Sequence, residues 1–326
     1  MSHAIFPDLN PATYQRHRLH SAERDWPETN CYLDVWIELL NTMGLPPEAC
    51  LGSLITQDFE GDQFTFFKVP LEDLETLFNI RVTELAVYNR VEDHILEQLS
   101  RGRLSLVEVD SYYLPDTQGF GYKQAHGKTS ISVNRLDLEA RTMDYFHGLS
   151  FYHLEGDDLD GIFQRGAFAR ELPFMPYTEF IKLPDQFPAR EVVVERCRAL
   201  LNRHIRRRPK ENPVRAFAAV MPEHVEGLAL QPFEAFHLYA FNTLRQLGAN
   251  FELYASHLSW LEEQSSGPLK EVAESAHKIS QTCKTVQFQL ARAVMRKKFQ
   301  NLDHLLDPAV DAWDELVQTL DTILQS

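Results

Sequence analysis

Cysteine is scarce in this sequence, and basic residues are fewer than acidic ones. The 326 residues include four cysteines, Cys31, Cys50, Cys197 and Cys283, which are widely spaced and form no C-x-x-C pair. This spacing argues against a disulfide framework or a structural zinc site and fits reduced thiols in a cytoplasm. The 32 Lys and Arg residues against 47 Asp and Glu give a net charge of −15. Such a charge argues against nucleic acid or an anionic membrane as the main partner.

The sequence also lacks long hydrophobic runs and glycine-rich phosphate loops. No apolar run approaches the roughly 18 residues that span a bilayer, and the N-terminal 20 residues lack the hydrophobic core of a signal peptide. We therefore expect a soluble, cytoplasmic protein. Without a phosphate-binding loop, use of ATP or a dinucleotide is not expected, and no cofactor is predicted.

The first half of the chain predicts an α+β domain. Helical periodicity is found over residues 31–43, 48–55, 71–78 and 91–99, and strand patterns follow over 104–110, 129–133 and 142–146. Helices followed by an antiparallel sheet are typical of the α+β class.

The second half predicts a packed helical domain. Strand patterns end near residue 185, which divides the chain into domains 1–185 and 186–326. Helices are expected over 189–206, 213–221, 231–247, 249–263, 268–297 and 308–325, with breaks at Pro209, Pro222, Gly248, Gly267 and Pro308. No internal repeat is evident, so a solenoid is not expected.

Cys31 is the first candidate for chemistry. It follows Asn30, a good N-cap, and opens the helix whose apolar face is Tyr32, Val35, Trp36, Leu39, Leu40 and Met43. A thiol in the first helical turn is favoured as a thiolate by unpaired amide N–H groups and the helix dipole. Asp34 and Glu38, in the following turns, oppose this effect. A small buried hydrophobic role is the alternative for Cys31.

His126 is the candidate base for this thiol. It immediately precedes the strand expected over 129–133, although a solvated loop histidine is the alternative. A third group should orient the imidazole, and the next strand offers Asp144 or His147, with Asn134 as a further option.

These residues carry a resemblance to known families. Asn30-Cys31 at a helix start, the segment LVEVDSYYLP and His126 before a strand resemble the N-terminal domain of the butirosin-biosynthesis acyltransferase type, which is papain-like. The stretches NCYLDVWIELL, DFEGDQFTFFK, LVEVDSYYLPDT and YFHG are similar to a bacterial family of unknown function whose genes occur near amino acid:carrier-protein ligases.

The resemblance implies a cysteine-dependent acyltransferase. Such an enzyme takes an acyl or aminoacyl group from a carrier-protein thioester and passes it to an amine or hydroxyl acceptor, with phosphopantetheine present only as part of the carrier. Cys31 and His126 match the nucleophile and base positions, whereas His147 occupies the position of the orienting Asp, and Asp144 lies three residues earlier. A thioesterase or peptidase, which differs in admitting water, and a non-catalytic carrier-binding partner are the alternatives.

Further residues are candidates for binding. Asn30 and Gln63 could each donate to an oxyanion, but a helix cap is the favoured explanation for Asn30 and an ordinary polar loop position is the favoured explanation for Gln63. Asp58 or Asp62 could hold a substrate ammonium group. The acidic loops do not match the spacing of a calcium loop, so no metal is expected.

The sequence has one dense basic run, which includes Arg206, Arg207 and Arg208. Cations at a helix C-terminus complement the helix dipole, which is reason enough for such a cluster. Its functional interpretation is a docking surface for an acidic carrier protein and its phosphopantetheine phosphate.

Overall fold

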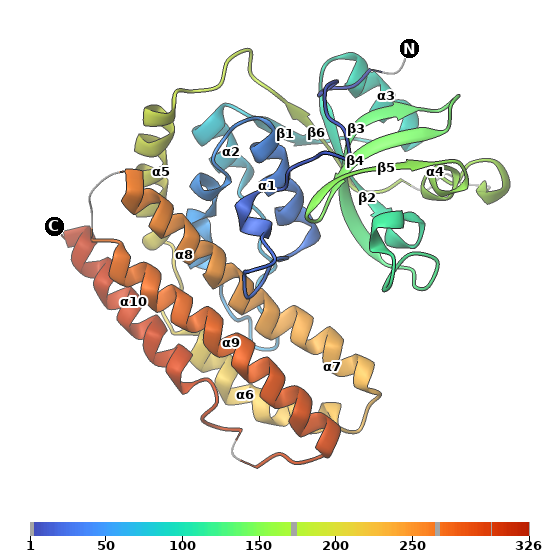
Figure 1. Ribbon diagram of the computed structural model, residues 1–326. Helices are drawn as coiled ribbons and strands as arrows, with labels where there is room; N and C mark the ends of the chain where they lie inside the picture. Colours follow the sequence, from blue (N-terminus) through green and yellow to red (C-terminus); the bar gives the residue numbers. More distant parts are fainter. Residues whose placement is uncertain (1–2, 171–174, 265–267, 301, 326) are drawn as a thin grey trace. The chain divides into compact units, whose positions relative to one another are not determined.

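The computed structural model describes residues 3–170, 175–264, 268–300 and 302–325 (Figure 1). The chain forms two compact units, each made of separate stretches. The first unit comprises Met1–His20, Asn30–Pro47 and Leu74–Pro188, and the second comprises Ser21–Thr29, Glu48–Asp73 and Ala189–Ser326. As the sequence predicts, an α+β region is followed by an all-helical region.

The first unit is built on a sheet of six strands in the order β1-β6-β2-β3-β4-β5, in which every neighbouring pair is antiparallel. The strands are β1 (Arg81–Glu84), β2 (Leu104–Asp110), β3 (Lys128–Asp137), β4 (Thr142–His147), β5 (Ser150–Glu155) and β6 (Thr178–Lys182). In the register of β2 and β3, Asp110 lies opposite Lys128. This pairing places the end of β2 beside the chain that enters β3.

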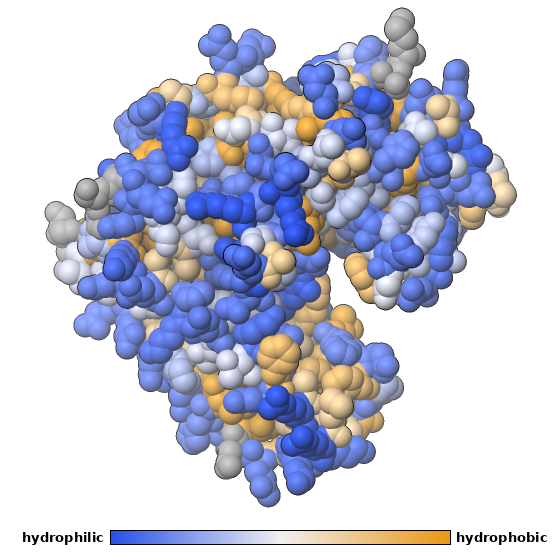
Figure 2. All heavy atoms as spheres, viewed as in Figure 1, coloured by the Kyte–Doolittle hydropathy of each residue, from blue (hydrophilic) through white to orange (hydrophobic). Residues whose placement is uncertain are grey.

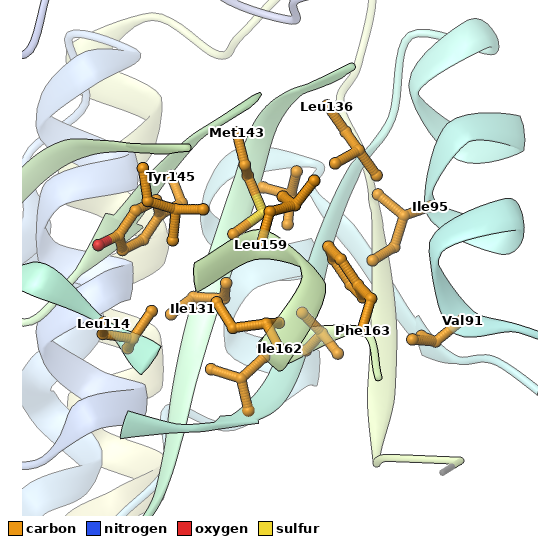
Figure 3. Close-up of a cluster of buried hydrophobic side chains, with 14 of the residues drawn as sticks. Val91, Ile95, Leu114, Ile131, Leu136, Met143, Tyr145, Leu159, Ile162 and Phe163 are labelled. Atoms are coloured by element: carbon orange, nitrogen blue, oxygen red, sulfur yellow. The ribbon is translucent and has the colours of Figure 1, made fainter. Parts of the chain in front are cut away.

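Helices pack on both faces of this sheet. Helix α1 (Cys31–Thr42) contacts β3, β4 and β5, whereas α3 (Val91–Ser100) contacts β2 and β3, and α4 (Asp157–Ile162) contacts β5. The α3 and α4 side is filled by a buried cluster that includes Ile131 and Val133 of β3 (Figure 3). Because side chains alternate along a strand, Ser130 and Ser132 point to the opposite face, toward α1.

Short helices complete the regular structure outside the helical region. They are η1 (Arg18–His20), η2 (Pro47–Thr56), α2 (Leu71–Phe78), η3 (Ser111–Tyr113), η4 (Pro115–Thr117) and η5 (Gly166–Phe168). The segment expected as an α-helix over 48–55 is the 3₁₀-helical η2.

The helical region of the second unit contains α5 (Arg190–Ile205), α6 (Pro213–Leu228), α7 (Phe233–Ala240), the π-helical turn η6 (Phe241–Arg245), α8 (Gln246–Gln264), α9 (Lys270–Arg296) and α10 (Asp307–Gln325). Helix α9 packs against both α8 and α10. Figure 2 shows hydrophilic side chains over most of the outer faces of α9 and α10, as expected for amphipathic helices with one buried side.

Two expected helix breaks are wrong. Pro222 lies inside α6, where burial of Met221, Val225 and Leu228 outweighs the missing backbone hydrogen bond. Gly248 lies inside α8, and a Cβ atom there would be 2.6 Å from the Trp26 ring. Gly248 therefore permits a close approach of that ring and does not end the helix.

The other predictions concern a helix break at Gly267, the strands and membrane-spanning helices. Gly267 lies outside the described residues. Strands β1, β5 and β6 were not predicted from the sequence. None of the helices in the described part of the chain combines the length and apolarity that a bilayer span requires.

Candidate functional site

Cys31 is the first residue of α1, as the sequence predicts. Asn30 is its N-cap, with an extended backbone and a side-chain oxygen that accepts the Leu33 N–H at 3.0 Å. The side chain of Cys31 is half-buried, and its Sγ donates to Ser130 Oγ of β3 at 3.8 Å. The thiol thus lies at the positive end of a helix and against a hydroxyl group of the sheet.

The other three cysteines are buried. Burial raises the pKa of Cys197 to about 12 and also raises the pKa values of Cys50 and Cys283. The reactive form of cysteine is the thiolate, so these three thiols are poor nucleophiles. Cys31 is the accessible one.

The acidic residues of α1 are paired with a buried cation. The Nδ1 of His20 lies 2.5 Å from Glu38 and its Nε2 lies 3.4 Å from Asp34. Burial alone would lower the pKa of His20, but hydrogen bonds to Asp34 and Glu38 and their charges outweigh it and raise the pKa to about 9. At neutral pH the imidazolium therefore offsets part of the negative charge of Asp34 and Glu38.

His126 is oriented by Asp110, a residue that was not predicted as part of the site. Its Nδ1 lies 2.6 Å from Asp110 Oδ2, and its ring stacks on Tyr112 with 4.4 Å between centroids. Burial opposes ionisation of Asp110, but hydrogen bonds from His126 and from the Tyr112 and Gly127 backbones lower its pKa. The His126 side chain is 70% exposed, so the pair meets solvent.

The groups expected to orient His126 contact other partners. His147 Nδ1 lies 2.5 Å from Asp116, and Asp144 lies 2.6 Å from His153. The Asn134 side chain bonds the backbone of Phe6. In the register of β3 and β4, Ser132 pairs with Phe146. His147 therefore lies opposite a β3 residue that is five positions beyond His126, too far along the strand to reach it.

The expected hydrogen bond between Cys31 and His126 is not made: among the described residues, Ser130 is the side-chain hydrogen-bond partner of Sγ, and Asp110 is that of the imidazole. Ser130 is four residues beyond His126, a span of roughly 13 Å in extended chain at about 3.3 Å per residue. The sulfur and the imidazole therefore belong to separate hydrogen-bond groups in this structure.

A second imidazole network lies on β3 and β4. Thr129 Oγ1 lies 2.8 Å from His147 Nε2, and Asp116 accepts hydrogen bonds from both His147 and the Tyr145 hydroxyl. Thr129, His147 and Asp116 thus form one chain of side-chain hydrogen bonds. The order hydroxyl, imidazole and carboxylate is that of a nucleophile triad, although Thr129 is only 7% exposed. Neither Thr129 nor Asp116 had a sequence signal.

A pocket of about 490 Å³ opens beside the His126–Asp110 pair. It is lined by Glu108, Val109, Asp110, Tyr113, His126, Gly127, Lys128, Gly161, Ile162, Gln164, Phe168 and Arg170. Cys31 is not among the lining residues. No group of three or more His, Cys, Asp or Glu side chains within the described residues could hold a metal ion.

The remaining predicted binding residues lie in the second unit, whereas Cys31 lies in the first. Asp58 accepts the Phe59 N–H at 2.8 Å, and Asp62 and Gln63 are exposed in the same loop. Asn30, in the first unit, uses its side-chain oxygen as a helix cap.

The basic run follows α5. Arg208 forms an ion pair with Asp321 of α10 at 2.6 Å. Arg206 and Arg207 are exposed and form no ion pair with any residue that the structure describes. Of these three arginines, Arg206 and Arg207 therefore keep their charge available to a partner.

Comparison with known proteins identifies the family. Residues 15–183 match the DUF1839 N-terminal domain, and residues 190–322 match the DUF1839 C-terminal domain. The chain therefore belongs to this family, whose function is unknown. Among curated proteins, none matches the chain significantly.

Proposed function

For this member of the DUF1839 family, we propose a cysteine-dependent acyltransferase that uses a carrier-protein thioester. The observation that carries the proposal is the position of Cys31, a half-buried thiol at the capped start of α1, in a chain whose other thiols are buried. The likeness of its surroundings to the papain-like butirosin-type acyltransferases adds support. The acyl or aminoacyl group passes to an amine or hydroxyl acceptor.

The reaction proceeds in two exchanges. In the first, the Cys31 thiolate attacks the thioester carbonyl, a carbon–sulfur bond to Cys31 forms, and the phosphopantetheine thiolate leaves and takes a proton. In the second, the acceptor attacks the carbonyl carbon of the acyl-enzyme and loses its proton, and the bond between that carbon and Cys31 Sγ breaks. The first exchange replaces one thioester with another and is nearly thermoneutral, so no coupled energy source is needed. The protein lowers the barrier by positioning the groups and stabilising the oxyanion.

His126 is the proton carrier in this proposal. Asp110 holds its Nδ1, which leaves Nε2 for proton exchange. In the structure Sγ bonds Ser130 and the imidazole bonds Asp110, so the mechanism requires Nε2 to approach Sγ, directly or through one water molecule, when substrate is bound. The Cys31 N–H at the helix start and the Ser130 hydroxyl supply hydrogen bonds to the developing oxyanion or thiolate.

A mass measurement tests the nucleophile. The protein is incubated with carrier protein that bears acetyl or glycyl thioesters, and the adduct is located by peptide mapping. We expect a mass increase on Cys31 that is absent from the Cys31→Ser variant, with Cys50, Cys197 and Cys283 as internal controls. A failure of every thioester to modify Cys31, or modification of the buried cysteines instead, would refute the proposal.

A non-catalytic carrier-binding protein is the second candidate. One observation favours it: Sγ bonds to Ser130 and not to an imidazole. It predicts carrier binding without an adduct, with equal affinity for the protein and the Cys31→Ser variant. Hydrolysis of the thioester without an acceptor would instead indicate a thioesterase.

Carrier docking has its own test. Replacement of Arg207 by Glu should weaken carrier binding at low ionic strength, because exposed complementary charges act on association. Arg16→Glu is the matched control, since Arg16 is also exposed and pairs with no described residue. Equal affinities of the two variants would remove the basic run from the docking surface.

A further inference from the structure

The pocket beside His126 has the dimensions and composition of a binding site for a small molecule. Its volume of about 490 Å³ lies within the range of roughly 300–1,000 Å³ typical of such sites. All of its lining residues belong to the first unit. We infer that it binds a small apolar monocarboxylate.

Apolar side chains form one part of the pocket. Val109 and Ile162 belong to the buried cluster between the sheet and α4 (Figure 3 labels Ile162), and the rings of Tyr113 and Phe168 meet edge to face at 5.6 Å. An aliphatic chain or an aromatic ring is the ligand component that gains most from such walls.

Gly161 gives the wall its shape. A Cβ atom at this position would lie 2.2 Å from the Tyr113 ring. Only glycine allows the ring to lie directly on α4, so the aromatic wall depends on a residue without a side chain.

The charges on the rim favour an anion. Glu108 is paired with Lys128 at 2.8 Å, and Asp110 is paired with His126 at 2.6 Å. Of the charged lining side chains, Arg170 alone forms no ion pair with a described residue. A ligand carboxylate would accept hydrogen bonds from the Arg170 guanidinium, which has no ion-pair partner among the described residues.

This inference concerns binding and does not require Cys31 to react. If the acyltransferase proposal holds, the pocket is a site for the acyl group or the acceptor. The two proposals fail separately, because ligand binding is measured on the Cys31→Ser variant, which cannot form an acyl-enzyme.

The experiment compares three probes by isothermal titration calorimetry at low ionic strength: phenylacetate, its neutral analogue phenylacetamide, and acetate, which lacks the apolar body. We expect phenylacetate to bind about tenfold more tightly than phenylacetamide, since a charged hydrogen bond is lost in the amide. Acetate should show no measurable binding.

Variants locate the site. Arg170→Glu should reduce phenylacetate affinity to that of phenylacetamide or below, whereas the exposed Arg16→Glu should leave it unchanged. Phe168→Ala should weaken both phenyl probes alike. Equal affinity for the acid and the amide, unchanged binding by Arg170→Glu, or no binding of phenylacetate at millimolar concentration would overturn the inference.

Discussion

The buried pair of carboxylates on α1 makes stability depend on pH through His20. The His20 side chain is 1% exposed and lies between Glu38 and Asp34. Its pKa is about 9 in the folded protein and 6.5 in the unfolded chain. A raised pKa means that protonation stabilises the folded state: the contribution is complete below pH 6.5 and is lost as the pH rises through 9.

The size of this contribution follows from the difference in pKa. A shift of 2.5 units at about 1.36 kcal/mol per unit gives about 3 kcal/mol of unfolding free energy between pH 6.5 and 9. Glu38 keeps other donors after His20 loses its proton, because the Tyr14 hydroxyl lies at 2.6 Å and the His17 N–H at 3.0 Å. The expected result is lower stability and not a local collapse of α1.

Urea denaturation at pH 6.5 and pH 9 measures the effect. Because other groups also titrate in this interval, the informative quantity is the difference between the protein and a His20→Gln variant. The variant should be less stable at pH 6.5 and should lose about 3 kcal/mol less between the two pH values. His304→Gln is the control, since His304 is 83% exposed and pairs with Asp307 at the surface. If His20→Gln retains the full pH dependence, the ion pair does not stabilise the fold.

Three other measurements test separate parts of the structure. Brief iodoacetamide treatment near neutral pH should label Cys31 before the other cysteines; preferential labelling elsewhere would contradict the nucleophile assignment. Gly161→Ala should lower the free energy of unfolding by about 1–3 kcal/mol, because the methyl group meets the Tyr113 ring. The control is Gly227→Ala in α6, where an added Cβ atom would have no neighbour within 4 Å, so this variant should not be destabilised. Equal losses of unfolding free energy in the two variants would refute the steric argument. Burial lowers the pKa of His257 to about 4, so the neutral ring contributes to the free energy of unfolding above pH 6.5, and this contribution is lost as the pH falls toward 4. A His257→Gln variant should lose less free energy of unfolding over that interval than the unchanged protein. An unchanged dependence of this free energy on pH would contradict the expectation.

Elements with a complete local signal were predictable from sequence. The apolar periodicity and the cap residue Asn30 placed the start of α1, and the buried run 104–110 gave β2 with the observed bounds. In contrast, β1 is four mostly exposed residues, and β6 lies between β1 and β2, so its pairing depends on partners more than 70 residues earlier. Short edge strands and long-range pairs have no pattern that a sequence window can detect.

The candidate site also depends on contacts between distant residues that a sequence window does not detect. Cys31 and His126 were identified from their positions at the start of a helix and before a strand. The partner of His126 is Asp110, 16 residues earlier, and only the register of β2 against β3 brings the two together. His147 likewise bonds Asp116 from a connecting 3₁₀-helix. The catalytic roles of Cys31 and His126 remain predictions.

The division of each unit among separate stretches of chain has a consequence during synthesis. The backbone N–H of Trp26 donates to the Glu252 carboxylate, and the Trp26 indole donates to Ser280. At about 5–20 residues per second, the 226 residues between Trp26 and Glu252 take roughly 10–45 s to translate. Until α8 and α9 leave the ribosome, the segment around Trp26 has no native partner in these helices, so the second unit completes its fold only after both helices have been synthesised.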